Sequence, residues 1–352
     1  MITDLFQEGV TKCLVGTRGL LGEGWDASKI NVLIDLTTVT TSMSINQLRG
    51  RSFRLDKDNP EKVANNWDIV CLAEEFSKGF DDYFRFKKKH SKLYGVCDDG
   101  AIEKGVGHVH ASFTEARPEG ISDIMSIFNE EMIQRSRDRE RIRELWALGR
   151  PFNSQAKKAF ELKMKNDFGQ GFPSSLKIGR AEWTEENLII SIAESVVRSF
   201  KEIGLIQYNA TVSAGERGGG WLRIFLEYSN DLESQLFTEA MEEILSPLDN
   251  PRYIIPREIK VISDTWISKM LPDVVGKYFQ KSTNKIAMYH SIPKKICQNK
   301  EHALIFQKNW NWFVSPGEIT YAHNETGMEK VHHANRHNLY PQGSLHTKDV
   351  FI

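Results

Sequence analysis

Two short motifs near the start of the chain contain the residues whose types and spacing could do chemistry. The first runs from Gly16-Thr17-Arg18 into Glu23-Gly24-Trp25-Asp26, and the second is Gln47-Leu48-Arg49-Gly50-Arg51-Ser52-Phe53-Arg54. Glycines in a loop let the backbone come close to a phosphate group. Arginines add forked donors that match phosphate oxygens in pairs. The two motifs together therefore suit a site that handles phosphate.

A helix must present the second motif. The stretch from Thr37 to Ser44 is rich in threonine and serine, which suits the start of a helix. On that helix Gln47, Arg51 and Arg54 share one face, because they are four and three residues apart. Gly50 costs a helix interior roughly 1 kcal/mol relative to alanine. We therefore expect a close-packing reason for this glycine.

Strands must present the first motif and flank the helix. We predict strands over Lys12–Gly16, Asn31–Leu36 and Trp67–Ala73 from their apolar content. Strand, loop, strand and helix in this order predict an α/β fold with a parallel sheet. Ligands of such sheets bind beyond the carboxyl ends of the strands. Thr17 and Arg18 fall at such an end.

In order and spacing, the two motifs resemble motifs V and VI of superfamily 2 helicases, which lie in the second RecA-like lobe. Glu-Gly-x-Asp and Gln-x-x-Gly-Arg-x-x-Arg are closer to the DEAH, UvrB and type III restriction branch than to the DEAD-box branch. The resemblance implies a partial RecA-like lobe of an ATP-dependent helicase or translocase. It covers only the first quarter of the chain.

The resemblance also implies roles for individual residues. Arg51 and Arg54 would act as arginine fingers on an ATP held by the first lobe, with Gln47 also facing the nucleotide. Gly24 and Asp26 would lie on the nucleotide side, where Asp26 helps to couple the nucleotide to the nucleic acid. The tryptophan before Asp26 departs from the usual motif.

On the nucleic-acid side, the resemblance implies that Thr17 touches a phosphate, with Arg18 beside it. The sequence has no Gly-x-x-x-x-Gly-Lys-Ser/Thr phosphate loop and no Asp-Glu-x-His run. ATP and Mg²⁺ are thus expected to bind mainly to a first lobe that is absent, present in cis or as a separate chain. We expect this chain to be the C-terminal portion of a longer helicase, inactive alone, with DNA as the expected nucleic acid.

Composition sets wider bounds. The chain has 352 residues, a formal net charge of -1 and four scattered cysteines. A near-neutral chain can still bind nucleic acid through a local basic groove. Few cysteines suit a reducing compartment, and the sequence shows neither a long apolar span nor a signal peptide pattern. We expect a cytoplasmic protein without a membrane segment.

Four regions are predicted. Residues 1–92 form the partial helicase lobe, 93–168 an irregular and then helical connecting region, 169–262 a small α+β domain, and 263–352 a C-terminal region with a flexible polar tail. The α+β domain is read as helix, hairpin, helix and strand, with the turn at Gly218-Gly219-Gly220.

Several basic and acidic patterns leave alternatives open. Lys87–His90 and the arginines of 135–143 fit either a solvated surface or contacts with nucleic acid. Glu161-Leu162-Lys163 and Glu258-Ile259-Lys260 match a nuclease pattern that occurs by chance in charged chains. A non-enzymatic nucleic-acid-binding or assembly module and a restriction-type subunit with a C-terminal nuclease thus remain alternatives. The histidines and cysteine of 90–110 match no standard zinc spacing, and no metal site is predicted.

Overall fold

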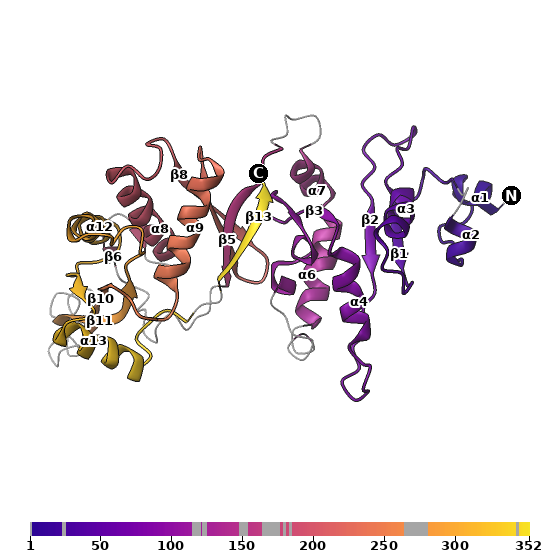
Figure 1. The fold of residues 1–352 in the computed structure, drawn as a ribbon. Helices are drawn as coiled ribbons and strands as arrows, with labels where there is room; N and C mark the ends of the chain where they lie inside the picture. Colours follow the sequence, from indigo (N-terminus) through magenta and orange to yellow (C-terminus); the bar gives the residue numbers. More distant parts are fainter. Residues whose placement is uncertain are drawn as a thin grey trace, which may run out of the picture. The chain divides into compact units, whose positions relative to one another are not determined.

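The computed structural model of the chain describes residues 2–22, 26–114, 121, 125–147, 154–163, 177–178, 181–182, 185–263, 281–342 and 345–352. The chain divides into two compact units, Met1–Gln155 with Val350–Ile352, and Ala156–Asp349 (Figure 1). Both units mix helices with strands, and the described part contains one small parallel sheet of two strands. The α/β character predicted from the sequence is therefore present.

The parallel sheet of the first unit pairs β1 (Val32–Asp35) with β2 (Asn65–Asp68). Between them in the chain runs α3 (Ser42–Ser52), which packs against both strands (Figure 1). Strand, helix and parallel strand were predicted in this order, and the prediction is confirmed. The second strand begins earlier than predicted and ends at Asp68 instead of Ala73.

The strand predicted over Lys12–Gly16 is wrong. These residues have no regular structure and connect α1 (Ile2–Gln7) to α2 (Arg18–Gly22). A strand needs a neighbour for its hydrogen bonds, and no described strand lies beside this stretch. The side chain of Val15 is correspondingly 88% exposed.

The rest of the first unit is more ordered than the sequence indicated. The elements after α4 (Asp81–His90) include an antiparallel hairpin of β3 and β4, and Val350 and Phe351 pair with β4. The elements are β3 (Tyr94–Val96), β4 (Ile102–Lys104), η1 (Val106–His108), η2 (Ala111–Thr114), α6 (Met125–Arg137) and α7 (Arg139–Trp146). The expectation that the connecting region over 93–168 begins as an irregular segment is therefore wrong for the described residues.

Side-chain hydrogen bonds to backbone carbonyl oxygens connect α6 and α7 to the rest of the first unit. Arg139 donates to the Val63 carbonyl at 2.6 Å, and Asn65 donates to the Ser136 carbonyl at 3.2 Å. Arg135 donates to the carbonyls of Val109 and Val96. These two arginines therefore hold the first unit together, instead of lying on a solvated face.

The second unit combines helices with antiparallel sheets. Strand β9 pairs with both β5 and β8, and β10 pairs with both β11 and β12. Its strands are β5 (Lys157–Lys163), β6 (Lys177–Ile178), β7 (Ala181–Glu182), β8 (Thr211–Arg217), β9 (Trp221–Glu227), β10 (Tyr253–Ser263), β11 (Lys281–Ser291), β12 (Thr320–Tyr321) and most of β13 (Leu345–Phe351). Its helices are α8 (Glu185–Glu202), α9 (Asp231–Leu245), α12 (Lys300–Phe313) and α13 (Glu325–Arg336).

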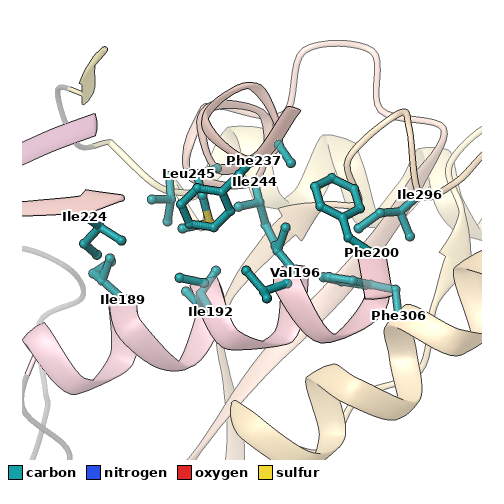
Figure 2. Close-up of a cluster of buried hydrophobic side chains, with 14 of the residues drawn as sticks. Ile189, Ile192, Val196, Phe200, Ile224, Phe237, Ile244, Leu245, Ile296 and Phe306 are labelled. Carbon is teal, nitrogen blue, oxygen red and sulfur yellow. The ribbon is translucent and has the colours of Figure 1, made fainter. Parts of the chain in front are cut away.

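The core of the second unit lies along one face of α8. Ile189, Ile192, Val196 and Phe200 recur at helical spacing and are buried against apolar side chains of α9, β9 and α12 (Figure 2). A helix with such a stripe gains most of its stability from packing that stripe. The predicted order of helix, hairpin, helix and strand is confirmed in this region.

The predicted flexible tail is wrong. After Ala322 the chain forms α13 and β13, and α13 carries a buried alanine, Ala334, that packs with Leu248, Ile254 and Tyr289. Small residues at the contact, Gly327 and Ala334, let the polar helix lie close to its neighbours. In the ranges that the structure describes, no helix combines the length and apolarity needed to cross a bilayer.

Candidate functional site

The two motifs lie next to each other in the folded chain. Helix α2 begins at Arg18, and the Arg18 guanidinium donates to Ser44 Oγ at 2.8 Å, at the start of α3. Just beyond the other end of α3, Arg54 forms an ion pair with Asp26. An aspartate of the first motif thus meets an arginine of the second.

Helix α3 has two distinct sides. Ile45 and Ser52 are buried, and Ser52 Oγ donates to Asn66 Oδ1 at 2.8 Å on the neighbouring strand. Gln47 is exposed, while Arg51 and Arg54 are partly exposed. Gln47 and Arg51 therefore lie on the outer side of α3, but the prediction that Arg54 shares their helix face is wrong, because the helix ends at Ser52. Thr41 occupies the N-cap position without a side-chain hydrogen bond to the helix.

The inner side of α3 is tied to a buried network of charged groups at the carboxyl ends of the strands. Asp35 is the last residue of β1, and Asp68 is the last residue of β2. Lys89 of α4 bridges them, with Nζ 2.9 Å from Asp35 Oδ2 and 3.1 Å from Asp68 Oδ1. Arg49 reaches Asp68 Oδ2 at 2.5 Å, and His90 Nε2 lies 3.0 Å from that oxygen.

The network changes the acid–base behaviour of its members. Burial raises the pKa of Asp68, but the hydrogen bond from His90 and the charges of Arg49 and Lys89 outweigh it, so the pKa falls to about 2. Burial lowers the pKa of His90, and it lowers the pKa of His108 to about 3. The His90 and His108 rings lie 5.0 Å apart. Aspartate is thus held charged and the histidines neutral.

A second contact fixes the segment that follows α3. Lys62 Nζ donates to the Arg54 carbonyl at 2.6 Å and to the Ser28 carbonyl at 2.5 Å. Arg49 therefore anchors α3 itself, and Lys62 holds the segment that follows it.

The contacts described above do not include the remaining motif residues, Thr17, Gly24 and Gly50. Thr17 is exposed just before α2, and the Thr17 carbonyl accepts the Leu21 amide at 3.1 Å. Gly24 lies outside the described residues. For Gly50 the packing prediction is wrong within the described structure, because an added Cβ would meet nothing within 4 Å.

Sequence reasoning missed the buried network. Lys87-Lys88-Lys89 was read as one basic stretch, but the Lys89 side chain is only 6% exposed. Its position follows from the helix, since Tyr83, Phe86 and Lys89 are three residues apart and all face inward.

Glu161, the carboxylate of the first nuclease-like pattern, is surrounded by positive charges. Glu161 is fully buried and pairs with Arg217, Arg223 and Lys348, each at 2.6 Å. Burial raises its pKa, but these cations dominate and lower it to about 2. Positive charges on three sides oppose the approach of a metal cation. Within the described ranges, no three metal-ligating side chains of His, Cys, Asp or Glu are gathered together.

No family model matches the sequence, and no curated protein or solved structure matches it either. Function must therefore be inferred from the motifs and from the geometry that surrounds them.

Proposed function

We propose that the first unit is part of the second motor lobe of a superfamily 2 helicase or translocase. The observation that carries the proposal is the meeting of the two motifs, where Arg54, just after α3, pairs with Asp26 and the inner side of α3 is anchored by Arg49. An anchored helix that presents arginines outward suits a lobe that acts on a nucleotide held elsewhere. The parallel pair of β1 and β2 is in accord with a RecA-like lobe.

In this proposal the arginines stabilise charge during phosphoryl transfer to water. ATP and Mg²⁺ would be held mainly by a separate lobe, in the same polypeptide or in another. Arg51 and Arg54 would then donate to phosphate oxygens as negative charge spreads over them. The Arg54 pair with Asp26 is partly exposed, with side chains 37% and 71% accessible. Exposed pairs contribute about 0–1 kcal/mol, so Arg54 can exchange Asp26 for a phosphate.

The nucleic-acid contact is assigned to Thr17 and Arg18. Both are exposed, on the segment that leads into α2. A hydroxyl and a guanidinium are donors that bind phosphate oxygens without reading the bases. The motor would thus hold the backbone of DNA, which lets it move along any sequence.

Binding of oligonucleotides by the purified chain tests this assignment. Arg18→Ala should weaken binding to DNA of every sequence and reduce the salt slope by about 1, because one phosphate contact is lost. Arg141→Ala is the matched control, since Arg141 is an exposed arginine that pairs with Glu144 on α7. Loss of binding with Arg141→Ala but not with Arg18→Ala would move the nucleic-acid contact to α7.

A further inference from the structure

The last turn of α4 and the hairpin that follows it gather lysines on the surface of the first unit. This lysine cluster consists of Lys87, Lys88, Lys92 and Lys104, the first partly exposed and the others exposed. Within the described ranges, none of the four forms an ion pair with a carboxylate. Other cations of α4 do, since Arg85 pairs with Asp82 and Lys89 with two aspartates. The cluster is therefore a local excess of positive charge on a chain whose formal net charge is -1.

Backbone hydrogen bonds bring the members of the cluster together. The chain turns at the end of α4, where the Leu93 amide donates to the His90 carbonyl at 2.9 Å. The Gly105 amide, just after β4, donates to the Leu93 carbonyl at 2.9 Å. Lys92 precedes Leu93 and Lys104 precedes Gly105, so the two lysines occupy neighbouring positions. The basic end of α4 thus meets the open end of the hairpin.

An exposed aromatic ring lies within the cluster. Tyr94 of β3 stands opposite Lys104 of β4, and Lys104 Nζ lies 5.9 Å from the centroid of the tyrosine ring. The Phe351 ring packs against the same ring with centroids 5.9 Å apart, yet Tyr94 is 56% exposed. A Cβ added at Gly95 would lie 2.2 Å from the His108 ring, so β3 packs tightly on η1. The tyrosine is therefore held on a fixed strand with more than half of its surface in solvent.

The acidic residues of the same elements are directed elsewhere. Glu103 is 1% exposed, and successive side chains of a strand point to opposite faces, so its carboxylate and the Lys104 ammonium lie on opposite sides of β4. Asp98 and Asp99 lie in the turn of the hairpin, at the end opposite to Lys104. The two aspartates of α4 lie in its first turn. The positive charge of the cluster is thus not offset within its own elements.

We propose that the lysine cluster and Tyr94 bind single-stranded nucleic acid, in addition to the contact assigned to Thr17 and Arg18. Lysines bind phosphate oxygens whatever the base sequence, and an exposed aromatic ring offers a surface on which a base can stack. In a duplex the bases are already stacked on one another, so the ring favours a single strand. The cluster belongs to other elements than Thr17 and Arg18, so the proposal does not rest on the motor assignment.

Fluorescence anisotropy of a labelled oligothymidylate, titrated with the full chain at several salt concentrations, tests the role of the lysines. Lys88→Gln, Lys92→Gln and Lys104→Gln, combined in one variant, should weaken binding at 0.1 M salt by about tenfold or more. They should also lower the salt slope by about 2, because each phosphate contact contributes about 0.7 on a single strand.

A second triple variant is the matched control for the loss of charge. Lys29→Gln, Lys158→Gln and Lys308→Gln remove the same number of positive charges from lysines that pair with carboxylates. This control should keep the affinity and the salt slope of the parent. Thermal unfolding of all variants checks that they are folded.

Tyr94→Leu tests stacking with the lysines intact. It should weaken binding of the oligothymidylate by about tenfold, leave the salt slope unchanged and leave the affinity for a duplex of equal length unchanged. Tyr208→Leu is its control, because Tyr208 is 79% exposed and also has a lysine, Lys201, over its ring, at 5.6 Å. This control should bind as the parent does.

The outcomes separate this surface from the contact at Arg18. Normal binding by the cluster variant together with loss in Arg18→Ala would overturn the present proposal and leave the proposed function intact. Loss in the cluster variant with normal binding by Arg18→Ala would support the cluster and contradict the assignment of Arg18. Equal losses in the two triple variants, or binding to vesicles of phosphatidylserine and phosphatidylcholine without binding to the oligothymidylate, would also overturn the proposal.

Discussion

At the scale of single residues, the first unit depends on a few buried charges that the motifs did not reveal. Arg51, Arg54 and Asp26 could be found from motif spacing, and two of them meet in the folded chain. Asp68 and Lys89 could not, because their role depends on which strand ends lie side by side. Spacing along a chain identifies one face of one helix, whereas a network between elements requires the tertiary packing.

Asp68→Asn should destabilise the first unit strongly. Removing one partner from a buried ion-pair network leaves the other charges uncompensated, at a cost of about 3–5 kcal/mol. Hydrogen exchange of the α3 amides should show this as faster exchange, since Arg49 loses its anchor. Asp58→Asn is the control, because Asp58 is 75% exposed and pairs only with Lys29 among its described contacts. Similar exchange in the two variants would argue against an anchoring role for the network.

His290 should make the second unit sensitive to acid. Burial, followed by the charge of Arg257, lowers the pKa of His290 to about 3. Between that value and the ordinary pKa near 6.5, the unfolded chain binds one more proton than the folded chain. Stability therefore rises with pH in this window and is lost as the pH falls, by up to about 1.4 kcal/mol per pH unit.

The variant His290→Asn tests this directly. Its side-chain amide can still donate to the Ile244 carbonyl, which His290 Nδ1 contacts at 2.9 Å, but it binds no proton. Urea unfolding between pH 7 and pH 4.5 should show a shallower loss of stability for this variant. His323→Asn, at an exposed position, should keep the slope of the parent. An unchanged slope in His290→Asn would mean that another group takes up the proton.

At the scale of elements, the sequence predicted the helices that are determined by local residues. It did not predict the elements whose formation depends on contacts with other parts of the chain. The helix predicted after the hairpin of the α+β domain is α9, where Asn230 and Glu233 form a reciprocal cap. The strand predicted over Lys12–Gly16 is absent, because a strand needs a neighbour. The tail that was predicted to be flexible contains α13. The sequence did not indicate this helix because its buried residues are glycine and alanine, which add little to a hydrophobic pattern.

The variant Gly50→Ala tests whether α3 needs a glycine for packing within this chain or for contact with another lobe. An added Cβ meets nothing within 4 Å in the described structure. In the isolated chain this change should therefore stabilise the helix by up to about 1 kcal/mol. If another lobe packs on this face during turnover, the same change should impair the complete enzyme. Thermal unfolding and ATP turnover together check this prediction. Unimpaired turnover in Gly50→Ala would contradict the idea that a second lobe packs on this face.

At the scale of the whole molecule, the two units differ in how well their apolar surface is covered. The second unit gathers side chains of α8, α9, α12 and several strands into one large core. In the first unit, β1 pairs only with β2 within the described ranges, and Val32, Ile34 and Leu36 are 44%, 57% and 73% exposed. Exposed apolar side chains on an edge strand favour association with other chains.

Limited proteolysis should reflect this difference. We expect a resistant fragment from residues 156–349 and earlier cleavage within residues 1–90. The core of the second unit includes Phe160 of β5 and Trp310 of α12, so we expect the resistant fragment to extend from β5 to α12. Mass spectrometry of the fragments provides the measurement. A resistant fragment that spans Met1 to Ala73 would show that the parallel pair is stable without further strands.

The most direct measurement of the central claim is ATP turnover with and without Arg51 and Arg54. The chain alone should show none, because its sequence has no phosphate loop. When the chain is joined with a polypeptide that carries the ATP-binding lobe, nucleic acid should stimulate turnover. Arg51→Ala and Arg54→Ala should each reduce it by about 10³ or more while sparing nucleic-acid binding. Turnover that is unchanged in Arg51→Ala and Arg54→Ala, or that the pure chain shows by itself, would contradict the assignment of a motor lobe.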